Sequence, residues 1–340
     1  MTSFERLQQT GILRLGPKNR FRYVSADGRT ISATDLARIG ALRIPPAWTE
    51  VAINRAAGGM LQAVGADAAG RCQYLYHEQH VKKREQKKFN RLLIFVEAVP
   101  KMRRAVNRNL RKRDLGRERV MGCILRILAT CFMRAGSQVY ANENGSYGLA
   151  TLRPKHVKVR GDVVEFNFPG KSQVIQQRVL KDRPVARVVR ELLQTPAREV
   201  FKYQNGDGRF VDVKRRDINA FIKEVMGQNF TSKDFRTWAG TLICACALAR
   251  AGAEVPESSA SKKRKVVQAI KETAEVLGNT PAVCRSAYIS PEVINRFERG
   301  EIIDQHFESL EELIGNRGTR LHKAEKALLR LLRKKSKQRK

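Results

Sequence analysis

The chain has 340 residues, 42% of them hydrophobic, which is enough for two domains with separate cores. Its 66 Lys and Arg residues against 33 Asp and Glu give a formal net charge of 66 − 33 = +33, which favours nucleic acid or, alternatively, an anionic membrane surface as partner. A run of about 18 apolar residues that could span a bilayer is absent, and so is a signal-peptide pattern at the N-terminus; we therefore expect a cytoplasmic protein without a membrane partner.

Residues 1–85 are predicted to form a small β-rich domain. "FRYVSADGRTIS" (21–32) contains two short alternating runs around the turn signal Ala26-Asp27-Gly28, which predicts a hairpin. "LRIPPAWTEVAINR" (42–55) carries a Pro-Pro turn followed by a strand. In "GRCQYLYHEQH" (70–80) the aromatic residues alternate, so Tyr74 and Tyr76 are expected on one face of a strand.

Around residue 81 the pattern changes to a nearly turn-free, Arg- and Lys-rich helical period that continues to residue 137. We therefore assign residues 86–340 to a larger, mainly helical second domain. Residues 101–119 hold nine basic residues and two acidic ones. This excess favours a basic wall along a nucleic-acid backbone, and an ordinary solvated helix face is the alternative.

A strand-rich region interrupts the helices over residues 147–180. Residues 163–168 and 173–180 alternate cleanly and are joined by "PGKS", which predicts a tight hairpin with Gly170 in a backbone conformation that favours glycine. Helices are expected again over 184–249, followed by a polar loop, "EVPESSASKKRKV" (254–266). The chain should end with a helix in "HKAEKALLRLLRKK" and a frayed tail, "SKQRK" (336–340).

The cysteines do not have metal-binding or redox spacing. The nearest pair is a CxC inside the apolar run "TLICACALA", so buried, reduced thiols are expected and a metal site is not supported. The cysteines are Cys72, Cys123, Cys131, Cys244, Cys246 and Cys284.

Four residues suggest chemistry on a phosphodiester. Tyr288 in "CRSAYISPE" lies between two helix-forming stretches, where its hydroxyl could be presented to a substrate or simply face solvent. A tyrosine is a poor nucleophile until cations lower its pKa, and attack on a phosphodiester increases the negative charge that cations must stabilise. Arg134 in "FMRAGSQVY", Arg236 in "SKDFRTWAGT" and Lys171 in "FPGKSQV" lie at turns or helix starts that could present such cations.

Together these segments resemble the type IB DNA topoisomerases, specifically the small poxvirus and bacterial form. "LRIPPAWTEV" and "GRCQYLY" are similar to its N-terminal domain, and "RAGSQVYANENGSYGLATLRPKHV" to the segment that opens with its first catalytic arginine. "FPGKSQV" resembles the hairpin with its catalytic lysine, "KDFRTWAGT" its second-arginine motif and "GNTPAVCRSAYISP" its nucleophile segment. The resemblance covers nearly the whole chain.

Carried over by position, the resemblance implies that Arg134 and Arg236 grip the scissile phosphate. Lys171 would protonate the leaving 5′ oxygen, and Tyr288 would attack to form a 3′-phosphotyrosine. Asn279 stands where many relatives in the wider superfamily carry histidine; an amide can still donate a hydrogen bond to a phosphate oxygen but carries no charge.

Further positions match DNA-contacting residues of the family. Tyr140 matches a tyrosine near the phosphate contacts, with core packing as the alternative. Arg71, Tyr74 and Tyr76 match residues that face the major groove, although the two tyrosines could simply pack. The implied fold is α+β, with a β-rich N-terminal domain and a mainly α-helical catalytic domain that close as a clamp around duplex DNA, joined near residues 78–88.

The resemblance further implies relaxation of supercoiled DNA by a nucleoid-associated monomer without a cofactor. A phosphotyrosine keeps the energy of the broken bond, and the sequence contains neither a GxxxxGK[ST] loop nor an acidic cluster for Mg²⁺. Two alternatives remain open from sequence. A tyrosine recombinase shares the Arg, Lys and Tyr chemistry but usually has an HxLRH-like second-arginine motif, and an architectural DNA-binding protein would explain the charge alone.

Overall fold

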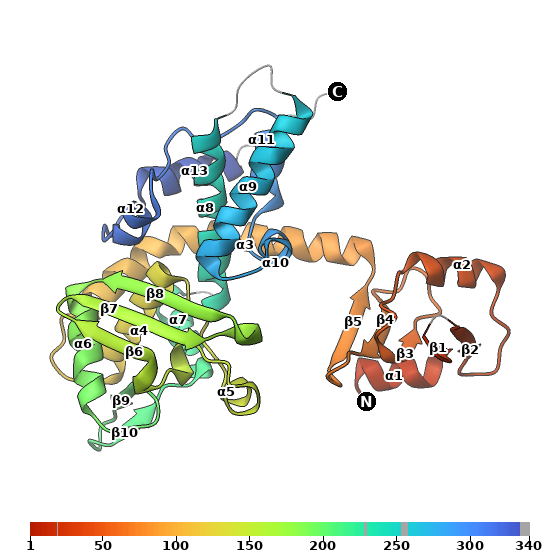
Figure 1. Ribbon diagram of the computed structural model, residues 1–340, viewed down its shortest axis with the longest axis horizontal. Coiled ribbons are helices and arrows are strands. Elements are labelled where there is room, and N and C mark those ends of the chain that lie inside the picture. Colours follow the sequence, from red (N-terminus) through yellow and green to blue (C-terminus); the bar gives the residue numbers. More distant parts are fainter. Residues whose placement is uncertain (19, 228–229, 253–257, 334–340) are drawn as a thin grey trace. The chain divides into compact units, whose positions relative to one another are not determined.

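The computed structural model describes residues 1–333 except 19, 228–229 and 253–257. The chain divides into two compact units, Met1–Asn90 and Arg91–Lys340 (Figure 1). The division falls within the 32-residue helix α3 (Glu78–Asn109), which contains Pro100. Among the described helices, none has the length and apolar character needed to cross a bilayer.

The N-terminal unit is built on a five-stranded antiparallel sheet with the strand order β2-β1-β3-β4-β5. Two helices accompany the sheet. The first, α1, begins with a capping box in which Thr2 and Glu5 satisfy each other's backbone N–H groups. The elements are α1 (Ser3–Thr10), β1 (Ile12–Leu15), β2 (Arg22–Ser25), α2 (Ala33–Ala41), β3 (Thr49–Ile53), β4 (Leu61–Ala66) and β5 (Cys72–Tyr76).

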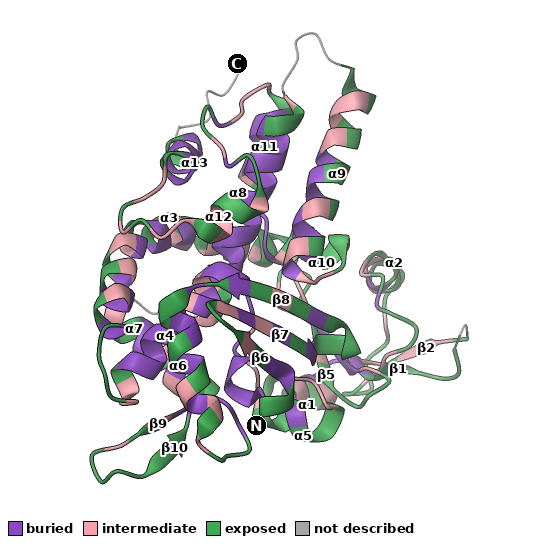
Figure 2. Cartoon of the chain, turned by 60° about the vertical axis from the view of Figure 1, so that its left-hand side comes forward, coloured by how far each residue is buried: buried purple, intermediate pink, exposed green. Residues whose placement is uncertain are grey.

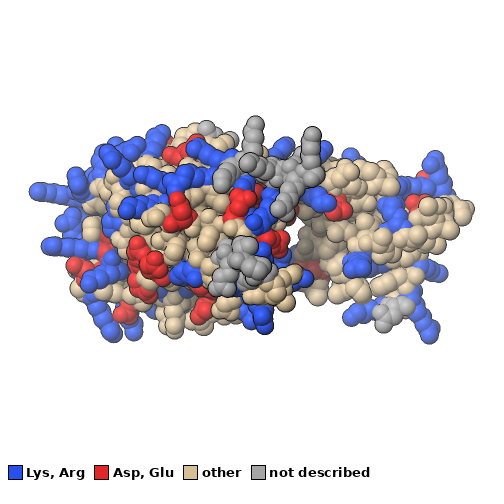
Figure 3. All heavy atoms as spheres, turned by 90° about the horizontal axis from the view of Figure 1, so that it is seen from above, with Lys and Arg blue, Asp and Glu red and all other residues tan. Residues whose placement is uncertain are grey.

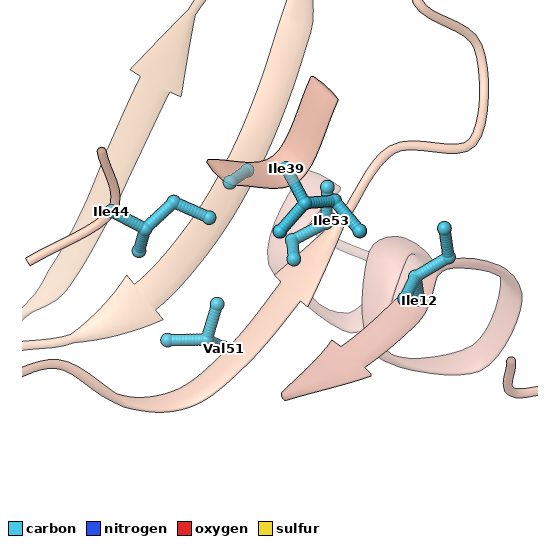
Figure 4. Close-up of a cluster of buried hydrophobic side chains, with 6 residues drawn as sticks. Ile12, Ile39, Ile44, Val51 and Ile53 are labelled. Carbon is cyan, nitrogen blue, oxygen red and sulfur yellow. The ribbon is translucent and has the colours of Figure 1, made fainter. Parts of the chain in front are cut away.

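One hydrophobic cluster of this unit joins the sheet to α2. Figure 4 shows Ile12, Ile39, Ile44, Val51 and Ile53, each at most 9% exposed. The partly buried ring of Trp48 packs against the same cluster. Burial of these branched side chains is the main favourable contribution to the stability of so small a sheet.

The hairpin expected over residues 21–32 is wrong. Only its first half is a strand, β2, which pairs with the preceding β1 and not with a following strand. Ser32 instead caps α2, accepting a hydrogen bond from the backbone N–H of Asp35 at 3.0 Å. A serine at an N-cap satisfies an otherwise unpaired helix donor, and this local signal outweighs the short alternation before it.

The C-terminal unit is mainly helical and contains a three-stranded antiparallel sheet, β6-β7-β8, and a two-stranded one, β9-β10. The strands are β6 (Val157–Arg160), β7 (Val163–Pro169), β8 (Ile175–Lys181), β9 (Lys202–Gln204) and β10 (Phe210–Asp212). The helices after α3 are α4 (Arg117–Cys131), α5 (Gln138–Asn144), α6 (Arg183–Gln194), α7 (Arg215–Met226), α8 (Ser232–Ala251), α9 (Ser259–Leu277), α10 (Pro281–Ala287), α11 (Pro291–Glu298), α12 (Leu310–Gly315) and α13 (Lys323–Arg333). Short 3-10 turns are η1 (Leu149–Thr151), η2 (Pro154–His156) and η3 (Lys171–Gln173).

Two helices form the centre of this unit. In α8 every residue from Phe235 to Ala249 is buried, and α4 is buried over most of its length (Figure 2). A helix that is apolar on all sides must be surrounded by other elements, and α9, α11 and α13 pack against α8. Both arginine segments of the candidate site are therefore attached to the two most buried helices of the unit.

Four of the nine basic residues in 101–119 form ion pairs within the protein: Arg103, Lys112, Arg117 and Arg119. Arg119 is 1% exposed and donates both terminal nitrogens to Glu191. Part of the basic stretch thus serves the fold and is unavailable to a polyanion.

The hairpin expected around "PGKS" is confirmed, because β7 and β8 pair antiparallel, but the backbone conformation expected of Gly170 is wrong. Gly170 has φ −92°, and the left-handed residues are Ser172 (φ 61°) and Gln173 (φ 60°). Glycine at position 170 instead leaves room for the side chain of Gln176, because a Cβ atom there would lie 2.7 Å from Cγ of Gln176. The expected loop over 254–266 is also wrong in part, since α9 begins at Ser259; its first residues to 257, and the tail 336–340, lie outside the described residues.

The cysteine prediction holds for five of the six thiols. All six are free, but Cys72 is exposed because its strand, β5, lies at the edge of the sheet. Burial raises the pKa of the Cys284 thiol to about 11 and that of Cys246 to about 11, which makes both poor nucleophiles.

Replacing Ile53 by Ala should destabilise the N-terminal unit by about 2–5 kcal/mol, because it leaves a cavity in the cluster beneath Trp48. Denaturant unfolding followed by tryptophan fluorescence measures the change. Leu36→Ala is the control, since Leu36 is 46% exposed on α2 and should change stability by no more than about 0.5 kcal/mol. Equal effects of the two substitutions would contradict the assigned core.

Candidate active site

Tyr288 lies at the C-terminal end of α10, at the corner between α10 and α11. Thr280 caps the start of α10 and Pro281 follows at its first turn, where a missing N–H costs nothing. The backbone N–H of Tyr288 donates to Cys284 O at 2.9 Å, which closes the last turn. The side chain is 9% exposed, so the tyrosine is neither a solvent-facing side chain nor fully enclosed.

Helix α8 holds this corner at close range. A Cβ atom on Gly240 would lie 2.9 Å from the carbonyl oxygen of Tyr288 and 3.0 Å from its Cβ, so only glycine allows the approach. The neighbouring Thr241 hydroxyl donates to Tyr288 O at 3.2 Å and accepts from the backbone N–H of Ser290 at 3.1 Å. The backbone that follows the Cα of the nucleophile candidate is thus fixed to α8.

One turn earlier on α8, Arg236 contacts the Tyr288 ring. Its Cζ lies 4.8 Å from the ring centroid, and the side chain is 3% exposed. One terminal nitrogen donates to Leu277 O at 2.8 Å and the other to Phe132 O, while Nε is buried without a hydrogen-bond partner. Burial, together with the charge of Arg134, lowers the pKa of Arg236 to about 10.

Arg134 and Asn279 meet beside this arginine. Arg134 donates to Oδ1 of Asn279, and the other amide atom, Nδ2, is buried without a partner. Within residues 1–333 as described, two buried donors in one group of side chains are therefore unsatisfied, the Arg236 Nε and the Asn279 Nδ2. Buried donors normally have an acceptor, so their arrangement suits an anionic ligand.

The electrostatics of the group act on the Tyr288 phenol. Burial by itself raises its pKa, but the charges of Arg236, Arg134 and Lys233 and the contact with Arg236 outweigh that effect. The net pKa of Tyr288 lies below its ordinary value. A phenol that ionises more readily in a buried cationic site is the condition under which tyrosine becomes a useful nucleophile.

The segment after Arg134 is held by two glycines. Gly136 has φ 84°, and a Cβ on Gly148 would lie 2.6 Å from the Cα of Gly136. This close approach lets Leu149 N donate to Arg134 O at 3.0 Å and Ala150 N to Ala135 O at 2.8 Å. The backbone that carries Arg134 is therefore held by two hydrogen bonds from the 3-10 turn η1.

Lys171 is not brought into this group. It lies on the exposed η3 tip between β7 and β8, and within the described residues its side chain makes no hydrogen bond or ion pair. The tip is tied to the Arg134 segment, because Gln173 donates to Asn144 O and Tyr147 N donates to Pro169 O at 2.8 Å. Lys171 is thus placed near the end of α5, with its amino group free.

The other predicted contacts lie on the surface. Tyr140 on α5 is 54% exposed, so the core-packing alternative for it is wrong. Tyr74 and Tyr76 share one face of β5, with ring centroids 6.4 Å apart, which confirms the predicted alternation. Tyr76 also packs partly against the sheet core, whereas Tyr74 is 42% exposed. Arg71 forms an ion pair with Asp67 at 2.7 Å.

Comparison with known proteins assigns the family. Residues 77–313 match the family described as eukaryotic DNA topoisomerase I, catalytic core, and residues 20–67 match bacterial DNA topoisomerase IB, N-terminal domain. The chain is 34% identical over 295 residues to DNA topoisomerase 1B of Acanthamoeba polyphaga mimivirus, covering 85% of this chain and 88% of the viral one. The chain belongs to the type IB DNA topoisomerases.

A second relative extends the comparison. DNA topoisomerase 1B of vaccinia virus (strain Copenhagen) is 26% identical over 247 residues, which covers 71% of this chain and 74% of the viral one. This type IB topoisomerase therefore acts on DNA and relaxes its supercoils, and its α+β fold joins a bacterial-type N-terminal β-sheet domain to the catalytic core. Groups of three or more His, Cys, Asp or Glu that could hold a metal ion are not found among the described residues.

The sequence motifs missed residues that position the topoisomerase site. Arg178 on β8 donates to Cys131 O at 3.3 Å and to Val276 O at 3.1 Å, which joins the ends of α4 and α9 just before Arg134 and Asn279. Nothing in its strand distinguishes it from other basic residues. Gly240 did carry a signal, because an isolated glycine within a helix costs about 1 kcal/mol and usually has a packing reason.

Replacing Gly240 by Ala should slow DNA cleavage by roughly 10²-fold, because the added methyl group displaces the Tyr288 backbone, and a shift of about 1 Å can cost that much. Single-turnover cleavage of a duplex, with duplex binding measured separately, tests this. Gly315→Ala is the control, since a Cβ there meets no atom within 4 Å. Unchanged cleavage by the Gly240 variant would show that the close contact does not position the nucleophile.

Proposed function

We propose that the topoisomerase relaxes DNA through a 3′-phosphotyrosine formed on Tyr288. The observation that carries the proposal is the buried cationic group around this phenol, with two donors that have no acceptor. Arg119 also has an unpartnered Nε, but its charge is paired with the carboxylate of Glu191. Among the described residues, Arg236 interacts with carbonyl oxygens and the Tyr288 side chain but with no carboxylate, so a phosphodiester is the charge partner that suits it.

In the proposed cleavage step, the phenol of Tyr288 loses its proton to solvent and its oxygen attacks the phosphorus. The P–O5′ bond breaks, and the leaving 5′ oxygen takes a proton from Lys171. Arg134, Arg236 and the Nδ2 of Asn279 stabilise the nonbridging oxygens as their charge increases. Religation reverses these steps, with the free 5′-hydroxyl attacking the phosphotyrosine, so neither a nucleotide nor a metal ion is needed.

Lys171 has to reach the phosphate from the exposed η3 tip. Its amino group has no competing partner in the part of the chain that the structure describes, and Ser172 and Gln173 beside it occupy the left-handed region that non-glycine residues rarely adopt. Strain of this kind is often found at functional turns. We propose that DNA binding brings the tip and the Tyr288 group to the same phosphate.

The remaining assignments concern the DNA path. We propose that residues 1–85 and 86–340 close around duplex DNA as the halves of a clamp, in a cytoplasmic, nucleoid-associated monomer. The duplex would be contacted by Tyr140 of the catalytic domain and by Arg71, Tyr74 and Tyr76 of the N-terminal domain. The exposed positions of Tyr140 and Tyr74 support this. Lys and Arg side chains cover much of the face in view in Figure 3, with fewer acidic residues between them.

Tyr288→Phe should abolish relaxation and the covalent adduct with DNA while duplex binding is kept, because only the attacking oxygen is removed. The adduct is measured by trapping with denaturant after incubation with supercoiled plasmid. Tyr203→Phe is the control, since Tyr203 lies on β9, outside the Tyr288 group. An adduct formed by the Tyr288 variant would reject the assigned nucleophile, and equal loss in both variants would point to misfolding.

Lys171→Ala should slow cleavage by roughly 10²–10⁴-fold, the usual range for a lost general acid, with little effect on duplex binding. A substrate whose bridging 5′ oxygen is replaced by sulfur has a better leaving group, and it should restore much of this rate. Arg236→Ala is the comparison, since a residue that stabilises nonbridging oxygens should gain little from the sulfur. Equal rescue of both variants, or of neither, would contradict the separate roles.

A further inference from the structure

A second basic hollow lies in the C-terminal unit, away from Tyr288. It has a volume of about 420 Å³ and is formed where the ends of α3 and β8 meet α4, the start of α6 and the segment around Arg317. Its lining contains five cations and one carboxylate, a formal charge of 5 − 1 = +4. The charged residues are Arg111, Arg126, Lys181, Asp182, Arg183 and Arg317.

The carboxylate organises the floor of the hollow. The side chain of Asp182 is 2% exposed and accepts from the backbone N–H of Val185 at 3.2 Å, from Arg126 at 3.3 Å and from Arg317 Nε at 2.8 Å. One negative charge thus holds two guanidinium groups in place. Asn107 accepts a further hydrogen bond from Arg126, which fixes its orientation.

The rim carries cations without such partners. Arg111, Lys181 and Arg183 are exposed, and within the described part of the chain their side chains make no hydrogen bond or ion pair. Three more positive charges around a floor that is already positive repel one another. An anion with several acceptor oxygens removes this repulsion and uses the free donors.

The hollow is separate from the Tyr288 group. Along β8, the side chain of Gln176 lies against Gly278, next to Asn279, whereas Lys181 is five residues further on. Five residues of strand span about 17 Å. The hollow is also at the end of the β7–β8 hairpin opposite the η3 tip with Lys171, as the course of the two strands in Figure 1 shows.

We propose that this hollow, lined by Arg111, Arg126, Lys181, Arg183 and Arg317, is a phosphate-binding pocket distinct from the catalytic site. Two sources could supply its ligand, a free polyphosphate or the phosphates of a nucleic-acid backbone that passes this face. Both present closely spaced anionic oxygens to the same guanidinium and ammonium donors.

The test compares two variants of the full chain. The pocket variant is Arg111→Ala, Lys181→Ala and Arg183→Ala, which leaves the buried Asp182 pairs intact. The control variant is Lys158→Ala, Lys223→Ala and Lys271→Ala, which removes the same charge from exposed positions elsewhere. Both should cleave a saturating duplex at the unaltered rate, which checks that each is folded.

The first arm measures tripolyphosphate binding by calorimetry at low salt, and the pocket variant should bind roughly tenfold more weakly than the control. The second arm measures how duplex affinity depends on salt; three lost phosphate contacts should reduce the logarithmic slope by about 2 to 3 relative to the control. Weaker tripolyphosphate binding with an unchanged slope assigns the pocket to a free polyphosphate. A reduced slope, with or without weaker tripolyphosphate binding, assigns the pocket to a nucleic-acid backbone. If the pocket variant and the control variant have the same tripolyphosphate affinity and the same slope, the proposal is overturned.

Discussion

The buried guanidinium of Arg236 is the interaction on which the rest of the site depends. It reaches the carbonyl oxygens that follow α4 and end α9, and its Cζ lies 4.8 Å from the centre of the Tyr288 ring. A single side chain therefore fixes three segments that are far apart in the sequence. Removing a cation from water is unfavourable, and carbonyl dipoles compensate only in part, so the packing around Arg236 must hold this buried charge in place.

That packing relies on small residues at points where backbones come close. Gly240 allows the Tyr288 corner to lie against α8, and Gly148 allows the Arg134 segment to pair with its own continuation past Gly136. The first contact fixes the position of Tyr288 against the buried helix α8. The second fixes the segment that carries Arg134, directly after the buried helix α4. Interiors packed at crystal-like density change shape little, so packing fixes the positions of Tyr288, Arg134 and Arg236, whereas the exposed Lys171 tip lies outside this packing.

The same unit uses buried arginines in two different ways. Arg119 and Arg296 are each at most 2% exposed and are paired with carboxylates, Arg296 with both Glu292 and Glu301. These pairs stabilise the fold and are closed to ligands. Around Arg236 and in the hollow beside Asp182, positive charge exceeds negative charge, and we propose that the excess donors bind phosphate. The overall charge of +33 does not distinguish these two uses, which depend on where each carboxylate lies.

Much of this protein was determined by local sequence. The alternation around Tyr74 predicted its strand, the ordered motifs predicted the family, and Arg134, Arg236 and Asn279 near Tyr288 were named from their segments, whereas Lys233 was not. Local signals also conflicted, as where the N-cap at Ser32 replaced an expected strand and where Ser172 and Gln173, not Gly170, took the left-handed turn positions.

Only the tertiary structure decided which cations meet. Arg134 and Arg236 lie 102 residues apart, and their joint effect on the pKa of one phenol depends on the packing of α4, α8 and α9, a long-range result that no local pattern encodes. The same is true of Arg178, whose partners Cys131 and Val276 are distant in sequence. The residue types can be predicted from sequence because the chemistry requires them within short motifs. Burial and charge pairing cannot, because they arise only when separate segments pack into one core.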